Sequence, residues 1–271
     1  MKKIILVLVA LLCIATPVLI ITIHYREMIN AYDDEGRTRL INAACEDRWG
    51  EVRALIAVGA DVNKAMLSLG DYRSGGITVL MIAALRAEPV VIDALLAANA
   101  DVNAVDNVGT TALCRAIGSE NIYAVKALVK AGAGVFNSNK NSEPAFLLAA
   151  ESENGEIFDF MLTLIPGSDS PGLNAGMALS RCIKRGKIDR VKALLEAGAD
   201  VNWPDAEGWT ALMSAQVFGP PELTRLLLEA GADKDVVDDS GYSPLAMAII
   251  NRNRGAIRML KAGGALLTVP W

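Results

Sequence analysis

Histidine is nearly missing from this sequence, since His24 is the only one in 271 residues. Proton relays through imidazole and metal sites built from several histidines are therefore excluded. Phosphate-binding loops of the Walker type are also missing, because the glycines fall where helix ends and turns need them. We predict no catalytic residue, no metal or cofactor site and no small-molecule substrate. His24 itself is interpreted as a polar residue beside the apolar N-terminal segment.

Neither sign of charge dominates the chain, because 26 Lys and Arg face 31 Asp and Glu for a net charge of −5. Nucleic-acid binding needs a basic stripe along one face, so we expect no nucleic-acid partner. Several carboxylates recur in phase with the turns of the chain, and we interpret them as turn residues: Asp101, Asp106, Asp200, Asp205, Asp238 and Asp239.

A long uncharged run occurs near the start of the chain, where 20 residues from Ile4 to Ile23 follow two lysines. As a helix, a run of this length spans about 30 Å, the thickness of a bilayer's hydrocarbon core. We predict a transmembrane anchor over residues 1–23, with the rest of the chain outside by the positive-inside rule. A signal peptide cut after Ala15 and a lipid anchor at Cys13 remain alternatives. Residues 24–34 are expected to form a juxtamembrane linker.

The rest of the chain repeats one pattern, which is most complete over Gly208–Asp233. Its landmark is an apolar residue that returns after one interval of 40 and then five intervals of 33 residues: Leu40, Leu80, Leu113, Phe146, Leu179, Leu212 and Leu245. A period of 33 residues is typical of stacked helix pairs rather than of one globular core.

Two motifs mark the copies. The opening motif reads GRTRLINA, GITVLMIA, GTTALCRA, GWTALMSA and GYSPLAMA, from Gly36, Gly76, Gly109, Gly208 and Gly241. The closing motif reads GADVN, NADVN, GADVN and GADKD, from Gly59, Asn99, Gly198 and Gly231. These copies resemble the ankyrin repeat, with its Gly-x-Thr-Pro-Leu-His-x-Ala opening and Gly-Ala-Asp-Val-Asn ending, although the family's histidine is replaced in every copy. The fourth and fifth copies are degenerate.

The resemblance implies an all-α ankyrin-repeat solenoid of about seven stacked helix pairs with hairpin-like fingers, over residues 35–265. The copies are predicted at residues 36–63, 76–103, 109–137, 142–167, 175–202, 208–235 and 241–265. Residues 266–271 are an apolar tail. We expect Leu266, Leu267 and Trp271 to fold over the last helix, with contact to a partner as the alternative.

Three columns appear when the copies are aligned. A column of small residues should allow close helix packing: Ala43, Ala83, Ala116, Ala149, Cys182, Ala215 and Ala248. An apolar column should form the core between repeats: Leu55, Leu95, Leu128, Met161, Leu194, Leu227 and Leu260. A charged column should face water: Arg53, Asp93, Lys126, Asp159, Lys192, Arg225 and Arg258.

Two stretches break the period. Lys64–Gly75 adds seven residues to a finger and contains Tyr72, a candidate contact with a partner; a tolerated surface loop is the alternative. Ile165–Gly172 is expected to be a loop, and a bend there is possible in stacked repeats.

Three cysteines fall within the repeats, in the first, third and fifth copies: Cys45, Cys114 and Cys182. Two repeats at about 8–10 Å each separate them by roughly 20 Å, beyond the ~7 Å limit for a disulfide. We therefore expect free thiols.

The resemblance also implies protein binding through a concave surface of fingers and first helices. Trp203, Trp209 and Tyr242 are candidate anchors, with packing between fingers as the alternative. A basic run is the second candidate, as a dock for an acidic partner or as a solvated face: Arg181, Lys184, Arg185, Lys187, Arg190 and Lys192.

These observations predict a non-catalytic protein-binding module, tethered to a membrane with its repeats on the extracytoplasmic, periplasmic side. It would scaffold or inhibit another protein. Two alternatives are a redox-responsive accessory factor acting through Cys45 or Cys114, and a secreted soluble effector released by signal cleavage.

Overall fold

The computed structural model describes residues 23–69, 75–136, 144–167, 171–205 and 207–270. Outside these residues lie positions 1–22 of the predicted transmembrane anchor, Tyr72 and Trp271. Among the described residues, no helix combines the length and the apolar character that crossing a bilayer requires. Regular structure in this part of the chain is helical, apart from a single bridge between Tyr32 and Thr38.

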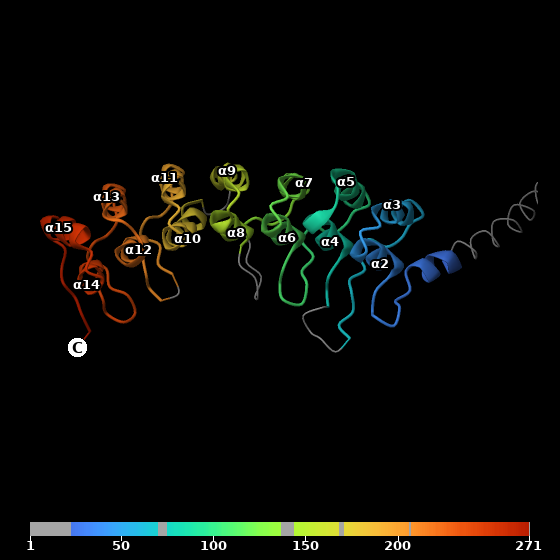
Figure 1. Cartoon of the computed structure of the whole chain (residues 1–271), viewed down its shortest axis with the longest axis horizontal. Helices are drawn as coiled ribbons and strands as arrows, with labels where there is room; N and C mark the ends of the chain where they lie inside the picture. Colours follow the sequence, from blue (N-terminus) through green and yellow to red (C-terminus); the bar gives the residue numbers. More distant parts are fainter. Residues whose placement is uncertain (1–22, 70–74, 137–143, 168–170, 206, 271) are drawn as a thin grey trace, which may run out of the picture. The chain divides into compact units, whose positions relative to one another are not determined.

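The described chain divides into two compact units, one ending at Gly134 and the other beginning at Val135. The first unit contains three helix pairs: α2 (Arg39–Cys45) with α3 (Trp49–Ala57), α4 (Val79–Arg86) with α5 (Pro89–Ala97), and α6 (Ala112–Gly118) with α7 (Ile122–Lys130). Helix α4 packs between α2 and α6, and α5 packs between α3 and α7. The pairs of this unit therefore stack in two rows, with the fingers beside the row of α2, α4 and α6 (Figure 1).

The second unit contains four helix pairs: α8 (Ala145–Glu151) with α9 (Gly155–Leu162), α10 (Pro171–Lys184) with α11 (Ile188–Glu196), α12 (Ala211–Phe218) with α13 (Pro221–Glu229), and α14 (Pro244–Ile250) with α15 (Arg254–Ala262). Helices α8, α10, α12 and α14 pack in succession. The all-α fold of stacked helix pairs is thus confirmed.

The stretch expected as a loop between the fourth and fifth copies is partly helical. It contains a 3₁₀ turn, η2 (Ile165–Gly167), and α10 already begins at Pro171. Proline favours the first position of a helix because its fixed φ suits the helix and its missing N–H is not needed there.

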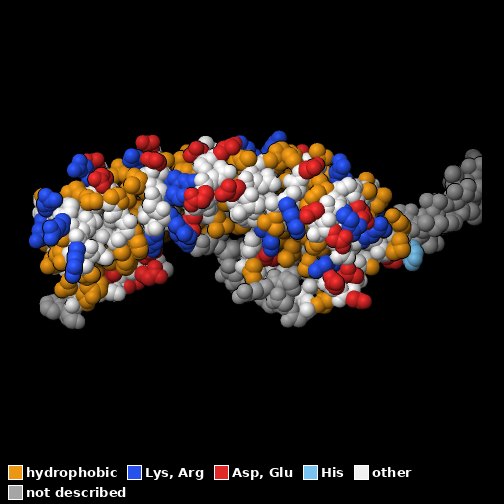
Figure 2. All heavy atoms as spheres, viewed as in Figure 1, with side chains coloured by type: hydrophobic (Ala, Val, Ile, Leu, Met, Phe, Trp, Pro, Cys, Tyr) orange, Lys and Arg blue, Asp and Glu red, His pale blue; other side chains and the backbone are white. Residues whose placement is uncertain are grey.

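The three sequence columns are confirmed. Every member of the small column is fully buried, every member of the apolar column is buried, and every member of the charged column is exposed. On the face shown in Figure 2, acidic and basic side chains are interspersed. One repeated unit therefore supplies both the packing between neighbouring helix pairs and the solvated surface.

Five of the first helices begin at hydroxyl caps, whereas α8 follows Pro144 and has no side-chain cap. Thr38, Thr78, Thr111, Thr210 and Ser243 each accept a hydrogen bond from the backbone N–H three residues later. A hydroxyl in this position satisfies a donor that the helix itself leaves unpaired. These caps support the helix starts in copies that lack the family's histidine.

In the three copies that end in Asp-Val-Asn, the closing asparagine joins the repeat to the one that follows, a role that we did not predict from the sequence. Asn202 Oδ1 accepts from the backbone N of Asp233 at 2.7 Å, and its Nδ2 donates to the backbone O of Gly231 at 3.2 Å. Asn63 and Asn103 make the same pair of bonds with the fingers that follow them. The fingers are therefore held together by an asparagine ladder.

Replacing Asn202 with alanine should lower the free energy of unfolding by about 1–3 kcal/mol, because two hydrogen bonds are lost at about 0.5–1.5 kcal/mol each. Asn202→Asp keeps the acceptor and loses the donor, so its effect should be smaller. Urea unfolding of the two variants beside the native chain measures both. Equal stability of Asn202→Ala and the native chain would contradict a clamping role.

The predicted linker contains the second half of a repeat. Residues 23–29 form a helix that ends at Ile29, whose side chain is 2% exposed. Asn30 Oδ1 accepts from the backbone N of Asp61 at 2.8 Å, across the same 31 residues that separate Asn202 from Asp233. The segment therefore packs on the first repeat as a preceding repeat would.

The turn after Asn30 has the form of a repeat finger. Asp33 Oδ1 accepts from the backbone N of Glu35 and Arg37, both at 2.9 Å. A signal was present in the sequence, because INAYDDEG from Ile29 aligns with VNAVDNVG from Val102.

The prediction that the apolar tail folds over the last helix was wrong for Leu266 and Leu267. Leu266 and Leu267 are 63% and 58% exposed. Backbone hydrogen bonds explain their position: Leu266 N donates to Asp235 Oδ1 at 2.7 Å, and Thr268 N donates to Ser243 Oγ at 3.1 Å. The tail thus takes the place of a following finger, and its backbone bonding leaves the leucine side chains in solvent.

Candidate functional site

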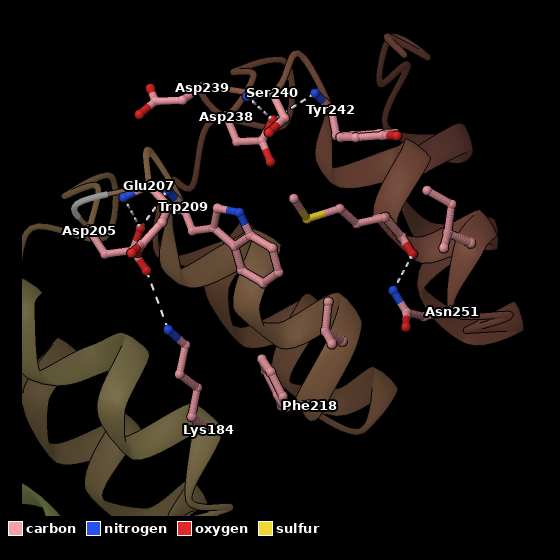
Figure 3. A pocket seen from close by; sticks show the side chains of 13 residues that line it. Lys184, Asp205, Glu207, Trp209, Phe218, Asp238, Asp239, Ser240, Tyr242 and Asn251 are labelled. Carbon is pink, nitrogen blue, oxygen red and sulfur yellow. Dashed lines mark hydrogen bonds and ion pairs between the residues drawn. The ribbon is translucent and has the colours of Figure 1, made fainter. Parts of the chain in front are cut away.

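A groove of about 860 Å³ lies along α12 and α14 in the second unit (Figure 3). We call it the α12–α14 groove, and it is lined by Lys184, Asp205, Glu207, Trp209, Val217, Phe218, Asp238, Asp239, Ser240, Tyr242, Met247, Ile250 and Asn251. Two finger turns close one end, and the ends of the two helices form the other. Its volume falls in the range of ligand-binding clefts.

Two aspartate turns hold the aromatic side chains of the groove. Asp205 Oδ1 accepts from the backbone N of Glu207 at 3.1 Å and of Trp209 at 2.8 Å. Asp238 makes the equivalent bond with the backbone N of Tyr242 at 2.8 Å. The interpretation of these aspartates as turn residues is confirmed, and the turns place Trp209 and Tyr242 one repeat apart in one groove.

Lys184 brings α10 to the same groove. Its Nζ lies 3.3 Å from Asp205 Oδ2 and 5.9 Å from the centre of the Trp209 ring. An ammonium group over an indole face is attracted by the ring quadrupole. Lys184, Trp209 and Tyr242 are therefore the predicted contact residues that the structure brings together.

Trp203 is not among the residues that line the groove. It packs against Gly176 of α10, where an added Cβ would stand 2.8 Å from the Trp203 Cβ atom. This close approach requires glycine at position 176. Trp203 thus contacts α10 while remaining 36% exposed, and the structure does not bring it together with Trp209 and Tyr242.

The sequence reading missed the apolar end of the groove. Phe218, the last residue of α12, is 51% exposed, and Ile250, the last residue of α14, is 60% exposed. The signal that could have found this end is the repeat position shared by Val217 and Ile250, which lie 33 residues apart, with Phe218 directly after Val217.

The basic run is largely paired within the second unit. Arg181 and Arg185 contact the carboxylate of Glu151 at 2.7 and 3.1 Å, and Lys187 contacts Glu153 at 2.5 Å. Partial burial alone would raise the pKa of Glu151, but the two guanidinium groups outweigh it and hold that pKa below its ordinary value. Arg181 and Arg185 are not brought into the groove.

Arg190 corrects the expectation that this run forms a solvated face, because its side chain is buried. Its guanidinium group donates to the backbone O of Ala150 at 2.9 Å and of Ala149 at 3.3 Å. It also lies 4.7 Å from the centre of the Phe158 ring. A cation at the C-terminal end of α8 is favoured because unpaired carbonyls give that end a partial negative charge.

The pairing of Glu151 predicts a loss of stability in acid. Its folded pKa lies below its ordinary value of 4.5, so the stabilisation is complete above pH 4.5 and is lost as the pH falls through the folded pKa. Urea unfolding should show the native chain losing its advantage over Glu151→Gln as the pH falls below 4.5. Glu196→Gln, at an exposed position of α11, is the control. A constant difference between Glu151→Gln and the native chain would contradict the pairing.

The three repeat cysteines are free thiols, and two of them have raised pKa values. Burial raises the pKa of Cys182 to about 12 and also raises the pKa of Cys45. Because the thiolate is the reactive form, neither is set up for redox chemistry at neutral pH. No group of His, Cys, Asp and Glu side chains suited to a metal ion occurs among the described residues.

The model of the family described as ankyrin repeats (3 copies) matches residues 80–170 and 179–269, more than half of the chain. The chain belongs to the ankyrin-repeat family. Ankyrin repeats form protein–protein interaction modules, and their homologues are generally non-catalytic. The α12–α14 groove is therefore a candidate protein interface of this ankyrin-repeat chain.

Known ankyrin-repeat proteins resemble this one over different lengths. Neurogenic locus notch homolog protein 1 of Xenopus tropicalis is 36% identical over 119 residues, which cover 44% of this chain and 4% of that protein. The ankyrin repeat domain of Bcl-3, a member of the IkappaB protein family, aligns with a TM-score of 0.66 and 25% identity over 84% of this chain and 100% of that one. An ankyrin repeat domain from Acinetobacter baumannii aligns with a TM-score of 0.59 and 30% identity, over 69% of this chain and 98% of that one.

Proposed function

We propose that this ankyrin-repeat protein binds another protein through the α12–α14 groove, and that it scaffolds or inhibits that partner without catalysis. The observation that carries the proposal is the exposure of Phe218 and Ile250 beside Trp209 and Tyr242. Large apolar side chains gathered in a concave surface gain about 25 cal/mol for each Å² that a partner covers. Tryptophan and tyrosine are frequent anchors of such interfaces.

The groove is preformed, which supports binding rather than simple exposure. Both aromatic side chains follow turns fixed by aspartate hydrogen bonds, and Phe218 and Ile250 stand on helices packed against each other. Residues that are already ordered lose less conformational entropy when a partner binds.

The second part of the proposal is a membrane tether over residues 1–23, with the repeats on the extracytoplasmic, periplasmic side. Its support is the uncharged run behind two lysines. Intact mass of the native chain and protease treatment of whole cells test it. The tether predicts an intact mass equal to that of the full-length chain, together with cleavage of the repeats by protease added outside the cells. A secreted effector predicts a mature chain that begins near Thr16.

Crosslinking and pull-down from native membranes test the groove. Phe218→Ser combined with Ile250→Ser should reduce capture of the partner about tenfold, which corresponds to about 1.4 kcal/mol of binding free energy. Melting should change little because both side chains are exposed. Leu266→Ser with Leu267→Ser is the matched control, since this pair is equally apolar and exposed but lies on the tail. Undiminished capture by the groove variant would refute the proposal.

A further inference from the structure

We infer that the occupant of the α12–α14 groove is a basic and apolar segment of a partner protein, with a Lys or Arg close to a large apolar side chain. This inference rests on the proposed function and specifies its partner. The groove is lined by four carboxylates, of Asp205, Glu207, Asp238 and Asp239, against the ammonium group of Lys184. The side chains that line the groove therefore carry a net negative charge, opposite to the charge of the basic run in the fifth copy.

Two of these carboxylates are already used by the protein. Asp205 is paired with Lys184, and the buried Asp238 accepts hydrogen bonds within its own turn. Glu207 and Asp239 are exposed, and neither forms an ion pair with a described residue. The charge available to a partner is thus that of Glu207 and Asp239.

These two carboxylates belong to adjacent finger turns. The backbone N of Asp239 donates to the backbone O of Glu207 at 3.3 Å, which keeps the two turns together. Carboxylates on two adjacent turns, neither of them in an ion pair with a described residue, attract a cation to this end of the groove. A lysine or arginine of the partner fits this end of the groove.

The other end of the groove selects an apolar side chain. Figure 3 shows Glu207 and Asp239 on the finger turns and Phe218 at the far end of α12, with Trp209 between them. A segment lying along the groove would place its cation at the fingers and its apolar side chain beside Phe218 and Ile250. Charge complementarity of this kind provides specificity for a basic segment, mainly because acidic segments would be repelled.

Selection from a random 12-residue peptide library on phage, with the full-length chain immobilised from detergent, tests the inference. The native chain should enrich peptides that carry Lys or Arg near a large apolar residue. Glu207→Lys with Asp239→Lys should enrich acidic peptides instead and bind the best native peptide at least tenfold more weakly. Glu196→Lys with Glu229→Lys makes the same charge change at exposed helix ends outside the groove and should behave as the native chain.

The outcomes separate the two proposals. Binding lost in Phe218→Ser with Ile250→Ser but unchanged in the charge-reversed chain would overturn the basic partner and leave the groove standing. Binding unchanged in both variants, or no enrichment over an uncoated surface, would overturn both. Enriched peptides that match a segment of this chain, together with a dimer in analytical ultracentrifugation, would show a second copy as the occupant and overturn a separate partner.

Discussion

Replacing Leu227 with alanine is expected to lower the free energy of unfolding by about 2–5 kcal/mol. Leu227 is the middle residue of the triple leucine run in α13 and is fully buried. It occupies the apolar column, where each member fills the space between one helix pair and the next. Truncation removes the transfer free energy of the deleted carbons and leaves a cavity that rigid neighbours fill only in part.

Leu226 supplies the matched control, because it has the same chemistry in the same helix but is half-buried. Leu226→Ala should lower stability by about 1 kcal/mol, in proportion to the smaller apolar area that it covers. Urea unfolding followed by circular dichroism measures both variants. Similar losses for Leu226→Ala and Leu227→Ala would show that the column does not distinguish core from surface.

Replacing Arg190 with alanine should lower stability by about 2–4 kcal/mol. The substitution removes charge-assisted hydrogen bonds to the carbonyls of Ala149 and Ala150 at the end of α8, and a buried acceptor left unpaired costs about 1–3 kcal/mol. It also removes the guanidinium group that covers the Phe158 ring. Thermal melting and urea unfolding measure the loss.

Two further substitutions separate the guanidinium group from its charge. Arg190→Lys keeps the positive charge but not the planar group, so it should recover only part of the stability. Lys192→Ala removes an exposed cation from the same helix and should change stability by less than about 0.5 kcal/mol. If Arg190→Ala were as stable as Lys192→Ala, the hydrogen bonds of Arg190 would contribute nothing to the fold.

The repeated part of the fold could be predicted from the sequence because each structural position is sampled seven times. One buried leucine says little, but Leu55 and its six equivalents along the chain share a single environment. The same logic located the aspartate turns and hence the neighbouring positions of Trp209 and Tyr242. Both predictions were possible because each repeat contacts only its neighbours, so equivalent positions in successive repeats have equivalent surroundings.

Features that occur once could not be predicted in this way. Arg190 is charged and belongs to a basic run, so the local pattern favours a solvated position, yet its hydrogen-bond acceptors lie 40 and 41 residues earlier in the chain. The tail is similar, since apolar composition favours burial and the backbone bonds to Asp235 and Ser243 leave Leu266 exposed. In both cases long-range hydrogen bonds, and not the polarity of the side chain, determine whether the residue is buried or exposed.

The partial repeat before the first copy bears on how any tether would behave. The described helical residues 23–29 directly follow the uncharged run in the sequence, and Ile29 and Asn30 hold them against the first repeat. If that run spans a bilayer, no slack chain separates the lipid headgroups from the first unit. The first unit would then change its orientation together with the transmembrane span and would not rotate freely about a flexible linker.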